Sequence, residues 1–108
     1  LVGTFGIECK HYESIEVQSL IWPKKAGMHL WWDKLQKEAN DHDKLPMLIA
    51  LQNFKPRLIG LSTKGANLFN FSPQKDIESY YIGYFPRLDL HLCYFDEFFK
   101  HFKPEVLE

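Results

Sequence analysis

The chain of 108 residues is 45% hydrophobic and 16% aromatic, which is typical of one globular domain and excludes an intrinsically disordered segment. It has no apolar run near the ~20 residues of a membrane helix and no visible secretory signal, so we expect a cytoplasmic protein with no membrane partner. The net charge of −1 argues against a strongly basic DNA-binding surface. Residues 1–64 carry nine Lys/Arg against seven Asp/Glu and residues 65–108 carry four against seven, so any nucleic-acid face should lie in the first part.

The first predicted element is a strand over residues 4–11, which carries the only (Asp/Glu)-x-Lys sequence of the chain. Side chains alternate along a strand, so Glu8 and Lys10 share one face while the apolar Phe5 and Ile7 share the other. Two positions span ~6.6 Å, so a carboxylate and an ammonium can converge on one phosphate. The carboxylate can hold Mg²⁺ and the lysine can offset charge on the phosphate. The alternative is a surface ion pair that stabilises the fold by ~0–1 kcal/mol.

A short extended segment is predicted over residues 11–21, and it ends at Trp22 because the residue before a proline avoids helical angles. A helix is then predicted over residues 27–41. Its apolar residues follow the spacing of one buried stripe, which comprises Met28, Trp31, Trp32, Leu35 and Ala39. Gln36 lies at the edge of this stripe, where its amide can face a cleft. An ordinary boundary glutamine is the other interpretation.

Three further strands are predicted. Residues 46–53 contain a continuous apolar run, as expected for a strand covered on both faces, and form a hairpin with residues 57–62. Over residues 87–94, leucines alternate with other residues in the pattern of a half-buried strand. With the strand over 4–11, they predict an α/β core, on the border of α+β: a mixed sheet with the helix over 27–41 packed on one face.

The C-terminal part gives weaker signals. Residues 63–79 are rich in turn-forming residues and predict a long loop or lid. The aromatic run over 80–85 is interpreted as core or as an oligomer interface, and the alternative is a surface that stacks nucleobases. Asp96 is expected to cap a closing helix over residues 97–102.

The two cysteines, Cys9 and Cys93, lie on apolar strand-like runs without the spacing of a metal site. We expect both to be buried free thiols, as in a reducing cytoplasm. None of the five histidines forms an i, i+4 pair, so the sequence does not predict a zinc site.

The order of these elements resembles that of the PD-(D/E)xK nuclease superfamily, the restriction-endonuclease-like and Holliday-junction-resolvase-like group. Glu8-Cys9-Lys10 matches its (D/E)-x-K strand motif, residues 31–39 match the helix that follows, and residues 46–51 match the next apolar strand. The resemblance covers about residues 4–62.

This resemblance implies a site. Glu8 and the backbone carbonyl of Cys9 would be metal ligands, Lys10 would be the catalytic lysine, and Gln36 would approach the DNA. It also implies Mg²⁺ or Mn²⁺ as the cofactor and DNA as the partner.

The chain departs from the family pattern in one respect. The family carries an acidic residue, usually Asp, on the strand before the motif, and residues 1–7 contain none. We therefore expect residues 1–106 to be a single nuclease-like domain that lacks the N-terminal part of the fold. Residues 107–108 would be the remnant of a vector-derived tag. A second copy of the chain, in a homodimer, would cover the exposed sheet edges.

The sequence thus predicts a metal-dependent DNA endonuclease or exonuclease domain that cleaves phosphodiester bonds in recombination, repair or restriction in a phage or a bacterium. Residues 1–108 alone are expected to bind divalent metal poorly and to be inactive, because one carboxylate and one carbonyl leave most Mg²⁺ positions to water. The alternative is a catalytically inactive nuclease-like module for nucleic-acid binding or protein assembly. An acidic residue encoded 10–20 residues before Glu8, the usual family spacing, would favour the enzyme.

Overall fold

The structure, a computed structural model, describes residues 4–12, 28–69 and 81–102. Their strands form one sheet in the order β1-β2-β3-β5-β4. The strands are β1 (Phe5–Tyr12), β2 (Leu45–Gln52), β3 (Lys55–Leu61), β4 (Tyr81–Phe85) and β5 (Leu90–Tyr94). The helices are α2 (Met28–Asp41), α3 (Thr63–Leu68) and α4 (Phe95–His101). No helix within these ranges has the length and apolar character needed to cross a membrane.

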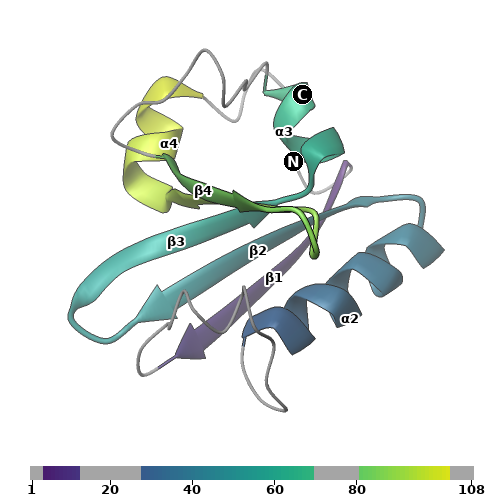
Figure 1. Cartoon of the computed structure of the whole chain (residues 1–108), viewed down its shortest axis with the longest axis horizontal. Helices are drawn as coiled ribbons and strands as arrows, with labels where there is room; N and C mark the ends of the chain where they lie inside the picture. The colour runs from purple at the N-terminus through teal and green to yellow at the C-terminus, as the bar shows by residue number, and fades with distance from the viewer. Residues whose placement is uncertain (1–3, 13–27, 70–80, 103–108) are drawn as a thin grey trace.

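The sheet is mixed. β1 and β2 are parallel, with α2 between them in the sequence, and β3, β5 and β4 continue the sheet in antiparallel order. α2 lies on one side of the sheet, and α3 and α4 lie on the other (Figure 1). The predicted α/β core of the restriction-endonuclease-like kind, with a mixed sheet and a helix packed on one face, is confirmed.

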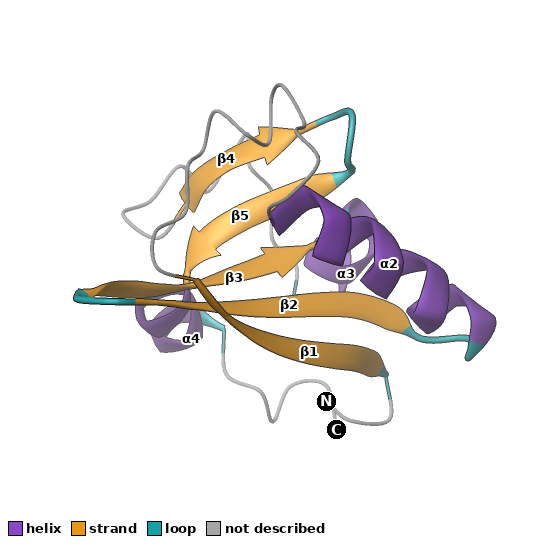
Figure 2. Ribbon diagram, turned by 90° about the horizontal axis from the view of Figure 1, so that it is seen from below, coloured by secondary structure: helices purple, strands orange, loops and turns teal. Residues whose placement is uncertain are grey.

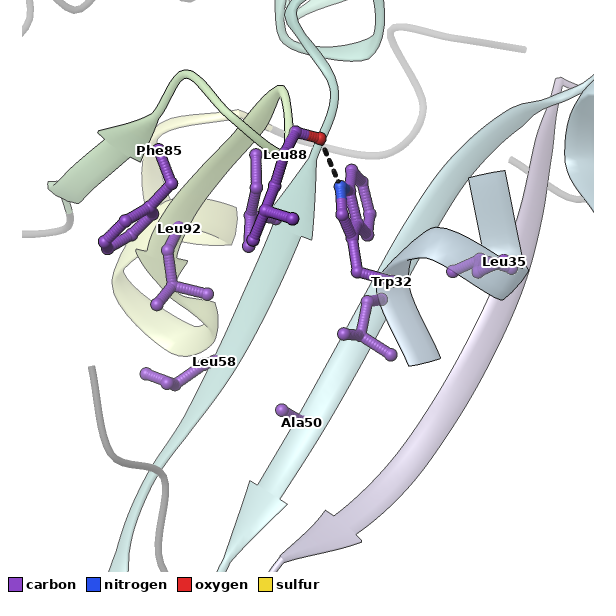
Figure 3. Packing of buried hydrophobic residues seen from close by; sticks show 9 residues of the cluster. Trp32, Leu35, Ala50, Leu58, Phe85, Leu88 and Leu92 are labelled. Atoms are coloured by element: carbon purple, nitrogen blue, oxygen red, sulfur yellow. Dashed lines mark hydrogen bonds between the residues drawn. The ribbon is translucent and has the colours of Figure 1, made fainter. Parts of the chain in front are cut away.

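On the side of α2, the core is built around Trp32, which is completely buried. The indole N–H of Trp32 donates a 2.8 Å hydrogen bond to the carbonyl of Leu88, in the turn between β4 and β5 (Figure 3). The strands twist so that β4 and β5 rise on this side of the sheet (Figure 2). The cluster comprises Trp32, Leu35, Leu48, Ala50, Leu58, Phe85, Leu88, Leu90 and Leu92. The helix is therefore held between the sheet and the β4–β5 turn, and its position beside β1 is fixed.

On the opposite side, α3 and α4 bury an aromatic cluster. The Phe69 ring lies 5.9 Å from the ring of Phe5 and 5.0 Å from that of Phe98, measured between centroids. The buried members are Phe5, Met47, Ile59, Leu61, Ala66, Phe69, Cys93 and Phe98. Because Phe5 projects into this cluster, the alternation along β1 turns Glu8 and Lys10 toward α2.

The predicted elements are largely confirmed. The strands predicted over 4–11, 46–53, 57–62 and 87–94 correspond to β1, β2, β3 and β5, and the helix predicted over 27–41 corresponds to α2. The extended segment predicted over 11–21 begins within β1, and its remainder over 13–21 lies outside the described residues.

The loop predicted over 63–79 is wrong in its first part, where the structure has α3. The Ser62 hydroxyl accepts a 3.2 Å hydrogen bond from the N–H of Gly65 and so caps this helix. Gly65 and Ala66 are buried, because their small size lets so short a helix lie against the sheet. The rest of the predicted loop, over 70–79, lies outside the described residues.

The aromatic run over 80–85 contains β4, which the sequence analysis did not predict as a strand. β4 is defined by its pairing with β5, a tertiary contact that a local pattern does not show. Phe85 is buried in the core, whereas Tyr84 is exposed.

The cap predicted at Asp96 is wrong. α4 begins at Phe95, two residues before the predicted start at residue 97, and its N-cap residue Tyr94 makes no side-chain cap hydrogen bond. The carboxylate of Asp96 instead pairs with the guanidinium of Arg57 on β3, which draws it away from the helix N–H groups.

The two cysteines differ in their surroundings. Both are free thiols; Cys93 is buried as predicted, but Cys9 is exposed. The reason is that β1 is the edge strand of the described sheet, and the aromatic cluster covers this face of β1 only at Phe5. Exposure therefore increases from Phe5 to Ile7 and Cys9.

Candidate active site

The structure brings Glu8 and Lys10 together. The Lys10 Nζ atom lies 3.1 Å from Glu8 Oε1, and the side chains are 28% and 39% exposed respectively. In the register with β2, Glu8 lies opposite Leu48 and Lys10 opposite Ala50, both of which are buried under α2. The pair thus stands beside an apolar floor, where it remains accessible to a ligand from solution.

The close approach of α2 to β1 depends on Gly6. A Cβ atom at this position would lie 3.3 Å from Ala39 Cβ, a contact that is tighter than most real Cβ contacts. Glycine therefore lets the second half of the helix lie directly against the strand, two residues before Glu8. This contact sets the width of the space between the two elements.

Trp31 holds Lys10 from the other side. The Lys10 Nζ atom lies 3.6 Å from the centroid of the Trp31 ring, and Lys34 Nζ lies 5.2 Å from it. The apolar spacing predicted that Trp31 belongs to the buried stripe of the helix, but the residue is 37% exposed, so that prediction is wrong. Consecutive helical residues are ~100° apart, and Trp32 takes the central buried position.

A groove runs between β1 and α2, and we call it the β1–α2 groove. One part of it, next to Lys10, is lined by Glu8, Lys10, Trp31, Lys34, Leu35 and Glu38. The adjoining part is lined by Gly6, Ile7, Glu8, Leu35, Glu38, Ala39, His42 and Lys44. The two parts share Glu8, Leu35 and Glu38, so the acidic residue of the motif stands in the middle of the groove.

Glu38 and Lys44 are groove residues that the sequence analysis did not single out. Glu38 lies on the same flank of α2 as Lys34, with which it makes a 3.9 Å ion pair. Its spacing of seven residues from Trp31 places both on one side of the helix, a signal that the sequence contained. Lys44 lies in the connection after α2, and the position of such a residue is set by the turn.

The described residues contain two of the donors that a metal site of the expected kind would need. The Glu8 carboxylate and the Cys9 carbonyl are hard oxygen donors, the kind that Mg²⁺ and Mn²⁺ prefer. Across residues 4–12, 28–69 and 81–102, however, no group of three or more His, Cys, Asp or Glu side chains is arranged to hold a metal ion. The donors thus fit the expected ion in kind, and their number within the described residues is incomplete.

Gln36 is placed apart from Glu8 and Lys10. It is partly buried on the other flank of α2, and it lines a second depression with Lys37, Asn40 and Lys64. Its predicted approach to DNA would therefore take place in that depression and not beside the Glu8–Lys10 pair.

Comparisons with curated proteins and with solved structures return no significant match. A comparison with protein families does return one, and it agrees with the (D/E)-x-K strand, the helix and the mixed sheet described above. The match covers residues 3–108, which confirms the resemblance found in the sequence, and the chain therefore belongs to the family described as "Phage putative PDDEXK endonuclease".

Proposed function

We propose that this chain is a metal-dependent DNA nuclease domain whose reacting centre is the Glu8–Lys10 pair in the β1–α2 groove. Membership of the endonuclease family supports a nuclease-like function at a coarse level. The observation that carries the assignment to these residues is the convergence of the two side chains, 3.1 Å apart and partly exposed, at the middle of a groove.

Glu8 and the carbonyl of Cys9 would hold the divalent ion, together with ligands from outside the described residues. When bound, such an ion lowers the pKa of a water molecule and so supplies a nucleophile at neutral pH.

Lys10 would act on the phosphate. An ammonium has three N–H donors, so the contact with one oxygen of Glu8 does not exhaust them. Its charge can offset the negative charge that develops on the phosphate oxygens during cleavage. The ring of Trp31 keeps this charge over the groove.

The substrate class of this site is DNA, as the nuclease family implies, and recombination, repair and restriction are the settings that we propose for it. A homodimer is also part of the proposal. Among the described residues β1 pairs only with β2, and its other edge could receive a strand of a second copy. Light scattering at high concentration checks this, and a strict monomer would contradict it.

The second candidate function is a catalytically inactive module that uses the nuclease-like fold to bind nucleic acid or to assemble. The observation that favours it is the direct contact of Lys10 with Glu8, which neutralises both charges when no metal is bound. In that case Glu8 and Lys10 would form only a partly exposed ion pair, which stabilises the fold by about 0–1 kcal/mol.

The test is cleavage of branched, single-stranded and duplex DNA by the full-length natural protein with Mg²⁺ or Mn²⁺. Lys10→Ala and Glu8→Gln should each abolish most of the cleavage. Lys100→Ala is the matched control, because Lys100 makes a comparable 2.9 Å ion pair with Glu97 on α4, away from the groove. Full metal-dependent activity of Lys10→Ala would remove Lys10 from the mechanism, and inactivity of the unsubstituted protein on all substrates would favour the module.

A further inference from the structure

A second depression lies beyond α2, where β2 begins and β3 ends. It is lined by Gln36, Lys37, Asn40, Lys44, Leu45, Pro46, Ser62 and Lys64. Three of these residues are lysines, two carry amides, and none is acidic. The net charge of the chain is −1, so this local excess of positive charge is a feature of one place and not of the whole surface.

The turn after α2 fixes the position of Lys44. Asp43 has a φ of 55°, and the N–H of Lys44 donates a 2.8 Å hydrogen bond to the carbonyl of Ala39. The N–H of Asp43 bonds the carbonyl of Asn40 at 3.1 Å, which completes a Schellman motif. The backbone of Lys44 is therefore anchored at the end of the helix.

Lys64 is anchored in a similar way from the other side. It lies in the first turn of α3, between the Ser62 cap and the buried Gly65. The preceding residue, Thr63, is bound through its N–H and its hydroxyl to the carboxylate of Asp89, at 3.2 and 2.6 Å. Both walls of the depression thus rest on hydrogen-bonded backbone.

The depression joins the reacting centre through Lys44. This residue lines both the second depression, which we call the lysine depression, and the part of the β1–α2 groove that contains Glu8. A path therefore runs from Lys10 past Glu8 to Lys44, and around the end of α2 to Lys37 and Lys64. The carboxylates of Glu8 and Glu38 lie at its centre, and lysines lie at both ends.

We propose that this lysine depression binds the phosphate backbone of the DNA strand that extends from the Glu8–Lys10 centre. The assignment rests on the proposed nuclease function. Lysine ammonium groups neutralise backbone phosphates, and amide side chains donate to phosphate and sugar oxygens, so such contacts position a strand without reading its sequence. Gln36 and Asn40, one helical turn apart on α2, supply the amides. The predicted contact of Gln36 with DNA would then be made in this depression and not at the Glu8–Lys10 centre.

The test is the salt dependence of DNA binding by the full-length protein. Lys37 and Lys64 are both exposed, so the double substitution Lys37→Gln/Lys64→Gln should leave the fold intact, as circular dichroism would verify. The control is Lys55→Gln/Lys100→Gln, which removes the same charge from two exposed lysines on β3 and α4. Binding of a fluorescent oligonucleotide would be measured by anisotropy at several salt concentrations without divalent metal.

The slope of log K against log salt should fall by about 0.7 per lysine for a single strand, or about 0.9 for a duplex, in the depression variant only. Equal slopes in the depression variant, the control and the unsubstituted protein would overturn the proposal. So would competition by polyglutamate as effective as that by DNA of the same charge, because the site would then accept an acidic peptide.

The outcomes also separate this inference from the proposed function. Loss of cleavage in Lys10→Ala together with an unchanged salt slope in Lys37→Gln/Lys64→Gln would refute the depression alone. If the salt slope is reduced in Lys37→Gln/Lys64→Gln but the unsubstituted protein cleaves no DNA, the nuclease function is refuted and the depression remains a DNA-binding surface.

Discussion

Lys10 and Trp31 meet across the β1–α2 groove, with the ammonium 3.6 Å from the centroid of the indole ring. One residue comes from the edge strand and the other from the exposed flank of the helix, so their contact ties the motif strand to α2 at the mouth of the groove. A cation over an exposed aromatic face is stabilised by about 0.5–1 kcal/mol. Trp31 is thereby a positioning residue for Lys10.

The first prediction concerns this positioning. On the proposed nuclease function, Trp31→Leu in the full-length protein should lower kcat for DNA cleavage by about two- to fivefold, because the lost interaction leaves Lys10 in more than one orientation. KM should change little. Trp31→Phe should recover most of the loss, since a phenyl ring still offers a π face. Steady-state kinetics of the three proteins makes the comparison, and a Phe variant as slow as the Leu variant would contradict the role.

The neighbouring tryptophan gives the second prediction, on stability. Trp32→Phe should lower the free energy of unfolding by about 2–4 kcal/mol, since it leaves space in the core and removes the donor that satisfies the Leu88 carbonyl. Trp31→Phe is the matched control and should change it by no more than about 0.5 kcal/mol. Urea unfolding measures both. Equal losses would mean that the two rings share the core.

The two tryptophans also show what the sequence could predict. The helix and its buried stripe follow from the apolar spacing, and the shared face of Glu8 and Lys10 follows from the alternation along a strand. An apolar pattern treats Trp31 and Trp32 alike, however. Only packing against the β4–β5 turn decides which of them is buried, and that turn is distant in the sequence.

Prediction of Lys44 as a groove residue, and of β4 and α3 as elements, also required tertiary information. Lys44 reaches the groove because the helix ends in a Schellman turn, and this turn uses Asp43 where glycine is the usual signal. β4 and α3 were missed for the same reason, since pairing with β5 and contact with the sheet define them. The strand motif was local and could be read directly.

The cysteines give the third prediction. Burial raises the pKa of the Cys93 thiol to about 12, so at neutral pH it carries almost no thiolate. Cys9 is exposed on the edge strand. A maleimide or aromatic disulfide reagent should therefore label one thiol rapidly in the folded protein, and Cys9→Ser should remove this fast phase. Rapid labelling that persists in Cys9→Ser would show that Cys93 is accessible.

His91 gives the fourth prediction, which concerns pH. Burial lowers the pKa of His91 below its usual value, and the charge of Asp89 opposes this shift in part. The Nε2 atom lies 3.0 Å from Thr63 Oγ1, and the ring stacks on Tyr84 at 4.2 Å between centroids. The unfolded chain therefore binds a proton at His91 more readily than the folded chain does. The contribution of His91 to the free energy of unfolding should be complete above the ordinary histidine pKa of about 6.5 and should decrease as the pH falls below it.

Thermal unfolding at about pH 7.5 and about pH 5.5 tests this expectation. The decrease in midpoint between the two conditions should be smaller in His91→Gln than in the unsubstituted protein, even if the variant is less stable at both. His42→Gln is the control, because His42 is exposed at the end of α2. An identical decrease in all three proteins would assign the pH dependence to other groups.

The last prediction concerns Phe54, at the tip of the β2–β3 hairpin. This side chain is fully exposed, and its φ of 57° lies in the left-handed region that bulky residues rarely adopt. This conformation costs a residue with a Cβ atom about 1–2 kcal/mol, and glycine adopts it without that cost. Phe54→Gly should therefore raise the free energy of unfolding by about 0.5–1 kcal/mol, after allowing for the greater entropy of glycine in the unfolded chain. Phe54→Ala keeps the strained Cβ and should change it little, because no buried area is lost. Urea unfolding of the pair decides: if the glycine variant is no more stable than the alanine variant, the turn is not strained at this residue.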